Sequence, residues 1–161
     1  MIFVTVGTQK FQFNRLLRYL DYLVEKQILS DEVFAQTGFS DYQPRYYAYK
    51  NFLDRDEFNQ KVLESQIIIT HGGTGAIMSA VKAGKKVIAV PRLCKYKEHV
   101  DDHQEQIIKQ LIGKKIIIGV NQLEDIEDAI TKCSTFPLRE YKSSTKTIID
   151  SIDNYIAELS K

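Results

Sequence analysis

The segment from 66 to 104 constrains the fold of this chain more than any other part of the sequence. It begins with a β-branched run, Ile67-Ile68-Ile69, which meets the glycine-rich turn His71-Gly72-Gly73-Thr74-Gly75. A helix-like segment follows, and a second apolar run, Val87 to Val90, stops at Pro91. Strand, glycine turn, helix and strand in this order are typical of a βαβ unit. Such a turn lets the backbone approach a ligand, and the helix start can bind an anion. The segment therefore predicts a site for a phosphate-bearing ligand at the carboxyl ends of parallel strands.

The glycine turn by itself leaves two interpretations open. No Gly-Lys-Ser/Thr follows it, so it is not a P-loop, and the spacing from Gly72 does not give the dinucleotide fingerprint G-x-G-x-x-G. A tight strand-to-helix connection without a ligand would use the same residues. In the same way, His71 fits either a phosphate contact or a cap of the turn, and Thr74 fits an N-cap as well as a phosphate contact.

Strands and helices alternate along the whole chain. Apolar runs predict strands at about 2–6, 32–36, 46–52, 67–70, 87–90 and 115–118. Helical spacing and capping residues predict helices at 14–26, from Asp54 through 63, after Gly75, at 101–112 up to Gly113, after an Asn121 and Glu124 capping pair, and at about 139–160 after Pro137. The pattern predicts one doubly wound, Rossmann-like α/β domain over 1–161, with a parallel sheet and helices on both faces.

Composition excludes several classes of protein. The 161 residues carry a net charge of +1, so no overall basic character favours nucleic acid or an anionic membrane. Cys94 and Cys133 make no metal or disulfide framework, and we interpret them as free thiols in a reducing compartment. Met1 to Val4 is strand-like without a basic leader, and no apolar run approaches membrane-spanning length. We therefore expect a cytoplasmic location.

Four motifs follow one another in the second part of the chain: His71-Gly72-Gly73-Thr74-Gly75, Ala83-Gly84-Lys85-Lys86, Ala89-Val90-Pro91-Arg92 and Glu98-His99-Val100-Asp101-Asp102-His103-Gln104. Val4-Thr5-Val6-Gly7-Thr8-Gln9 adds an opening strand and glycine loop. This ordered set, from Met1 to about Leu111, resembles the C-terminal half of glycosyltransferase family 28. It is similar to the small catalytic subunit that adds the second GlcNAc to dolichol-linked GlcNAc, and to bacterial capsule and exopolysaccharide β-1,4-glycosyltransferase subunits. The resemblance implies the donor-binding half of a GT-B enzyme.

The resemblance also implies roles for individual residues. The loops at Gly7 and Thr8 and at His71, Gly72, Gly73, Thr74 and Gly75 would hold the diphosphate of a UDP-sugar. Gln104, and less strongly Asp102, would bond hydroxyls of the donor sugar, because amide and carboxylate groups make directional hydrogen bonds. Arg92 fits bidentate phosphate binding and, equally, a surface salt bridge with Glu98 or Asp101.

Two features depart from the family pattern or leave it incomplete. Ser79 stands where many related enzymes have a carboxylate that grips both ribose hydroxyls, so this chain would hold ribose differently. No residue is identified as the general base; Glu98, His99, Asp101 and a partner chain are all candidates. Asp54-Arg55-Asp56 spells a metal motif but falls at a predicted helix cap, so no metal is expected.

The implied reaction is inverting transfer from a UDP-sugar to a lipid-linked saccharide in polysaccharide biosynthesis. Because the chain matches only the donor half of such an enzyme, the resemblance implies a membrane-anchored partner subunit that binds the acceptor. It would keep the complex peripheral at the inner face of the membrane. A non-catalytic nucleotide or nucleotide-sugar-binding module is the alternative, which Ser79 and the unassigned base favour. A nicotinamide-dependent oxidoreductase is weaker, because the fingerprint after the first strand is absent.

Overall fold

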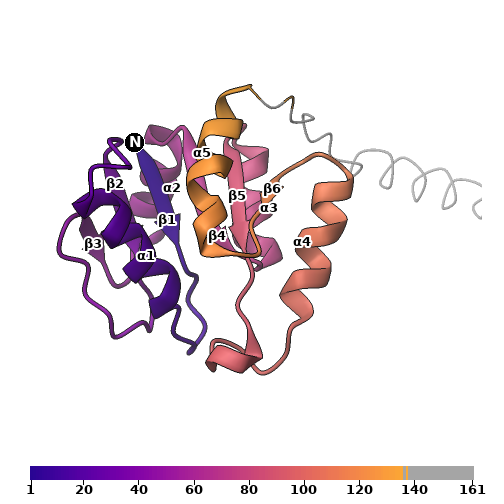
Figure 1. Cartoon of the computed structure of the whole chain (residues 1–161), viewed down its shortest axis with the longest axis horizontal. Helices are drawn as coiled ribbons and strands as arrows, with labels where there is room; N and C mark the ends of the chain where they lie inside the picture. Colours follow the sequence, from indigo (N-terminus) through magenta and orange to yellow (C-terminus); the bar gives the residue numbers. More distant parts are fainter. Residues whose placement is uncertain (136, 138–161) are drawn as a thin grey trace, which may run out of the picture.

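A parallel six-stranded sheet forms the centre of the molecule in the computed structural model, which describes residues 1–135 and 137 (Figure 1). The strands are β1 (Ile2–Thr5), β2 (Val33–Gln36), β3 (Ala48–Lys50), β4 (Ile67–His71), β5 (Lys86–Val90) and β6 (Ile118–Gly119). Their order is β3-β2-β1-β4-β5-β6, and every neighbouring pair is parallel. The order reverses between β1 and β4, which is where sheets of this type bind ligands at the carboxyl ends of their strands.

Helices cover both faces of the sheet, as the sequence predicts. One face carries α1 (Asn14–Glu25) and α5 (Ile126–Thr135), and the other carries α2 (Arg55–Glu64), α3 (Thr74–Lys82) and α4 (His103–Gly113). The register of β1 explains this arrangement, because alternate side chains of a strand point to opposite faces. Val4 packs with the leucines of α1, whereas Phe3 meets Phe58 of α2 edge-on with 5.3 Å between ring centroids. Each fully buried leucine or phenylalanine contributes roughly 2 kcal/mol.

The predicted cap at Asp54 is confirmed. Its carboxylate accepts hydrogen bonds from the backbone N–H groups of Asp56 and Glu57, both at 2.9 Å. Glu57 completes a capping box by accepting the N–H of Asp54 at 3.1 Å. The Asp54 carboxylate is therefore occupied by the helix start.

Two predicted elements near the end of the described chain are wrong in their bounds. A strand over 115–118 is replaced by the turn that closes α4, because Lys115 adopts a left-handed φ of 57° and donates to Ile112 O; only β6 remains extended. Asn121 and Glu124 form no capping pair. Gln122 precedes a short helix, η2 (Leu123–Asp125), without a side-chain cap, and α5 follows directly.

The strand predicted over 46–52 is also shorter, since only β3 pairs with the sheet. The helix predicted at about 139–160 lies outside the described residues. Within the described part of the chain, none of the helices has both the length and the apolar character needed to cross a bilayer.

Candidate functional site

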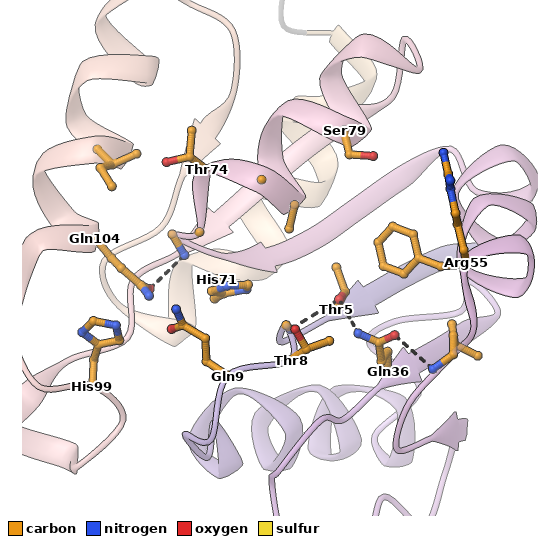
Figure 2. A pocket seen from close by; sticks show the side chains of 18 of the residues that line it. Thr5, Thr8, Gln9, Gln36, Arg55, His71, Thr74, Ser79, His99 and Gln104 are labelled. Carbon is orange, nitrogen blue, oxygen red and sulfur yellow. Dashed lines mark hydrogen bonds between the residues drawn. The ribbon is translucent and has the colours of Figure 1, made fainter.

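A cavity of about 650 Å³ opens at the carboxyl ends of β1 and β4 (Figure 2). Its walls come from the loop after β1, the end of β2, the start of α2, the turn between β4 and α3, and the loop that leads into α4. The lining residues are Thr5, Gly7, Thr8, Gln9, Gln36, Leu53, Asp54, Arg55, Phe58, Asn59, His71, Gly72, Gly73, Thr74, Gly75, Ala76, Ser79, His99, Asp101, His103, Gln104 and Ile107. Segments far apart in the sequence therefore meet at the edge that the strand order predicts.

His71 lies between the two glycine turns. A Cβ atom on Gly7 would come within 2.6 Å of the imidazole Cε1, and one on Gly73 would overlap with Nε2. The Thr70 hydroxyl donates to Thr5 O at 2.9 Å, which leaves its oxygen free to accept from His71 Nδ1 at 3.3 Å. This network assigns the proton to Nδ1 and leaves the Nε2 lone pair beside the glycine backbone. Glycine at both positions is thus needed to make room for the ring.

Burial, and then the nearby charge of Arg92, lower the pKa of His71 from 6.5 to about 4. The ligand-free imidazole is therefore neutral at pH 7. In this state His71 can meet a phosphate as a neutral hydrogen-bonding group and not as a cation.

The depressed pKa of His71 predicts acid sensitivity of the fold. Between pH 6.5 and pH 4 the unfolded chain takes up a proton on this side chain and the folded chain does not. Stability should therefore fall as the pH drops through that window, by roughly 2 to 3 kcal/mol from this group. Urea unfolding at pH 7.5 and pH 4.5 measures the loss, and a His71→Gln variant should lose that much less. Equal losses in the two proteins would contradict the assignment.

The start of α3 has the features of an anion-binding site. Gly73 occupies the N-cap position, so Thr74 is the first helical residue and not the cap. No side chain caps this end, and the first N–H groups of a helix have no acceptor within it. Thr74 and Gly75 are exposed to the cavity, where the partial positive charge of the helix start favours phosphate oxygens.

Gln104 joins this turn to the next strand. Its Oε1 accepts the N–H groups of Gly72 and Arg92, each at 3.0 Å, and its side chain is buried against Gly72. Among the described residues Nε2 has no hydrogen-bond partner, and Gln104 lines the cavity (Figure 2). The side chain therefore both fixes the turn and offers an amide donor to a ligand.

Two of the three candidate bases line the cavity. His99 Nδ1 lies 3.1 Å from Asp101 Oδ1, and its ring rests on Phe11 with 4.8 Å between centroids. The N–H of His103 also donates to Asp101 at 3.0 Å, and this bond together with His99 lowers the pKa of that carboxyl. With Nδ1 turned to the carboxylate, His99 keeps Nε2 for a ligand.

The third candidate, Glu98, is fully buried and does not line the cavity. Its carboxylate binds Arg15 through two hydrogen bonds of 2.9 Å and accepts the N–H of Leu93 at 3.0 Å. It holds the loop after β5, which contains η1 (Cys94–Tyr96), against α1. The geometry gives Glu98 a structural position.

Arg92 and Asp102 also lie outside the cavity lining. Arg92 is fully buried and donates from Nη2 to Val6 O and Phe11 O at 2.5 and 3.1 Å. Because the guanidinium is buried, it makes no surface salt bridge with Glu98 or Asp101, and a phosphate in the cavity would not lie directly against it. Asp102 is exposed and accepts the N–H of Cys94 at 2.7 Å.

The residues that β2 and α2 contribute to the cavity wall were not among the binding residues predicted from the sequence. Gln36 ends β2, donates to Thr5 Oγ1 at 3.3 Å and accepts the N–H of Leu53 at 3.2 Å. Arg55 of α2 and Ser79 of α3 line the same cavity (Figure 2). Asn59 of α2 also belongs to its lining. A polar residue at the end of a buried strand was the available signal for Gln36. Within the described residues, no group of three or more His, Cys, Asp or Glu side chains lies close enough together to hold a metal ion.

Residues 1–159 match the family model described as the glycosyltransferase family 28 C-terminal domain. The chain belongs to this family. No curated protein sequence matches it. The family and the sheet together make it a glycosyltransferase-like donor-binding domain with the Rossmann-like fold of a GT-B C-terminal half.

Solved structures agree with this fold. The glycotransferase of kitacinnamycin aligns with a TM-score of 0.63 and 14% identity, over 84% of this chain and 35% of that one. The glycosyltransferase SnogD from Streptomyces nogalater gives 0.59 and 17%, over 82% and 34%. The spinosyn forosaminyltransferase SpnP gives 0.54 and 16%, over 84% and 35%. The family 28 domain thus spans about a third of the length of each.

Proposed function

We propose that this family 28 domain binds a UDP-sugar and is the donor-binding catalytic subunit of an inverting glycosyltransferase. One observation carries the proposal. The glycine loop after β1 and the glycine turn before α3 face one cavity, with the uncapped start of α3 and the free amide of Gln104 beside them. Backbone N–H groups at such a place bind phosphate, and an amide donor beside them suits a sugar hydroxyl.

In the proposed reaction, a hydroxyl oxygen of the acceptor attacks the anomeric carbon of the donor sugar. The bond from that carbon to the diphosphate oxygen breaks, and UDP leaves with the bonding electrons. The loop N–H groups and the α3 dipole stabilise the charge that develops on the diphosphate, and we expect them to do so without a metal ion. The acceptor proton passes to a base, for which His99 with Asp101, or a group of a partner, is available.

We further propose that a second, membrane-anchored polypeptide binds the acceptor, a lipid-linked saccharide of a polysaccharide pathway such as capsule or exopolysaccharide synthesis. The length comparison supports a division of labour, because the matched transferases are about three times as long as the part that this chain covers. The complex would lie at the inner face of the membrane through that partner.

UDP is expected to bind the isolated chain with a dissociation constant of about 0.1 to 1 mM, since the phosphate turns all lie within it. Calorimetry with UDP, UDP-sugars, GDP and NAD tests the ligand class, and uridine serves as the control without phosphate. Absence of heat and of thermal stabilisation at millimolar UDP would refute the proposed donor.

Transfer itself is tested by adding the purified chain and a radiolabelled UDP-sugar to membranes of its native host. Label should enter the lipid extract only when both chain and membranes are present. A chain that binds UDP-sugars yet supports no transfer would be a nucleotide-sugar-binding module. Transfer by the purified chain alone to acceptor lipid extracted from those membranes would exclude a required membrane partner.

A further inference from the structure

Arg92 spans the loop that carries the first glycine turn. It follows Pro91 at the end of β5, and its Nη2 binds Val6 O and Phe11 O, the carbonyls on either side of the segment 7–10. Gly7, Thr8 and Gln9 of that segment line the cavity. One buried guanidinium group therefore fixes both ends of the first phosphate loop.

The positive charge of Arg92 is not balanced within the described fold. Its Nε and Nη1 are buried without a hydrogen-bond acceptor among the described residues. The carboxylate that favours its charged form is Glu98, but that carboxylate is bound to Arg15 on both oxygens. The ring of Phe13, 5.6 Å from Cζ, contributes only a cation–π contact. Burial lowers the pKa of Arg92 to about 10, so the group stays charged at pH 7.

The charge is felt at the cavity. Arg92 is the second cause, after burial, of the lowered pKa of His71, whose ring lies between the two glycine turns. The material between them is protein interior, where charges interact more strongly than across water. The charge that disfavours protonation of His71 would favour an anion bound at the glycine turns.

We propose that Arg92 is a positioning residue that supplies the buried positive charge of the diphosphate subsite, balanced by the ligand although the two never touch. This inference rests on the proposed function. It predicts that the chain binds nucleotides more tightly as phosphate charge increases, in a way that depends on Arg92. It also explains why a costly unpaired guanidinium is kept in the core.

The test measures the affinities of uridine, UMP and UDP for the parent chain and for Arg92→Met, Arg92→Lys and Arg18→Met. Arg92→Met should reduce the ratio of UDP to uridine affinity by at least about tenfold. Arg92→Lys keeps the charge and should retain most of the ratio. Arg18→Met removes an exposed arginine from the same helix as Arg15 and should leave the ratio unchanged.

A UDP to uridine ratio that stays unchanged in Arg92→Met would overturn the inference. Loss of the hydrogen bonds to Val6 O and Phe11 O would also disturb the loop at 7–10, so a reduced ratio is read together with the His71 pKa, which responds to the charge. NMR titration of His71 gives a readout without ligand: its pKa should rise in Arg92→Met and stay low in Arg92→Lys. An unchanged pKa in Arg92→Met would also overturn it. If Arg92→Met fails to fold, Arg15→Met replaces it, because Glu98 is then free to balance Arg92 and the ratio must still fall. A parent chain that binds no UDP refutes the proposed function instead.

Discussion

A Gly73→Ala variant is expected to bind UDP about a hundredfold more weakly than the parent chain while remaining folded. The added Cβ would overlap with His71 Nε2 and lie 3.0 Å from both Cδ2 and Cε1. The ring also lies close to Gly7, where a Cβ would come within 2.6 Å of Cε1, so His71 has little free space around it. Strain in the backbone is not the reason, since Gly73 has an ordinary φ of −71°. Overpacking of this kind costs roughly 1 to 3 kcal/mol. We expect the two glycine turns to shift in response, so that the cost appears as weaker UDP binding. Calorimetry and thermal unfolding measure the two effects.

A second pair of glycine variants separates ligand contact from damage to the protein. A Cβ on Gly75 or on Gly113 meets no protein atom within 4 Å, so neither substitution should disturb the fold. Gly75 lines the cavity, whereas Gly113 ends α4 away from it. Gly75→Ala should lower UDP affinity by about tenfold, because the methyl group occupies space that the phosphates need. Gly113→Ala should not. Equal affinities in the two variants would show that the ligand does not approach the start of α3.

The sheet and the two glycine turns could be anticipated because local signals specify them. β-branched runs bounded by glycine or proline define β1, β4 and β5, and helical spacing defines α1. Parallel strands then bring the turns that follow them to one edge, so Gly72 and Gln104 meet although 32 residues separate them in the sequence. The strand predicted over 115–118 was wrong because the turn that closes α4 at Lys115 takes the place of its first residues.

Side-chain direction could not be read from the sequence. Arg92 comes just after a buried strand, and a side chain at such a position can point into the cavity or beneath the neighbouring loop. In this fold its guanidinium lies beneath the loop, because it donates hydrogen bonds to the carbonyls of Val6 and Phe11. Lys95 and Lys97 lie close to Glu98 in the sequence, yet its partner is Arg15, 83 residues away. Such contacts between residues distant in the sequence depend on how the helices pack on the sheet, and this packing cannot be deduced from residue spacing or composition.

Glu98→Ala is expected to lower the free energy of unfolding by about 3 kcal/mol. The substitution leaves Arg15, whose side chain is 19% exposed, without its ion partner, and it leaves the buried N–H of Leu93 without an acceptor. Removing one member of a largely buried pair costs far more than the pair contributes when intact. Urea unfolding at pH 7 measures the change. Glu105→Ala, at an exposed position on α4, is the control and should change stability by less than about 0.5 kcal/mol.

A second substitution at this position, Glu98→Gln, distinguishes a structural role of Glu98 from a role as general base. Glu98→Gln keeps an acceptor for Leu93 and the shape of the side chain, so it should recover part of the lost stability. It should also keep the UDP to uridine affinity ratio, or raise it, because it removes a negative charge near Arg92. His99→Gln should show the opposite pattern, with stability almost unchanged and transfer to membrane lipid strongly reduced. If Glu98→Gln were as stable as the parent but inactive in transfer, the buried carboxylate would be the base, and the structural position given to it here would be wrong.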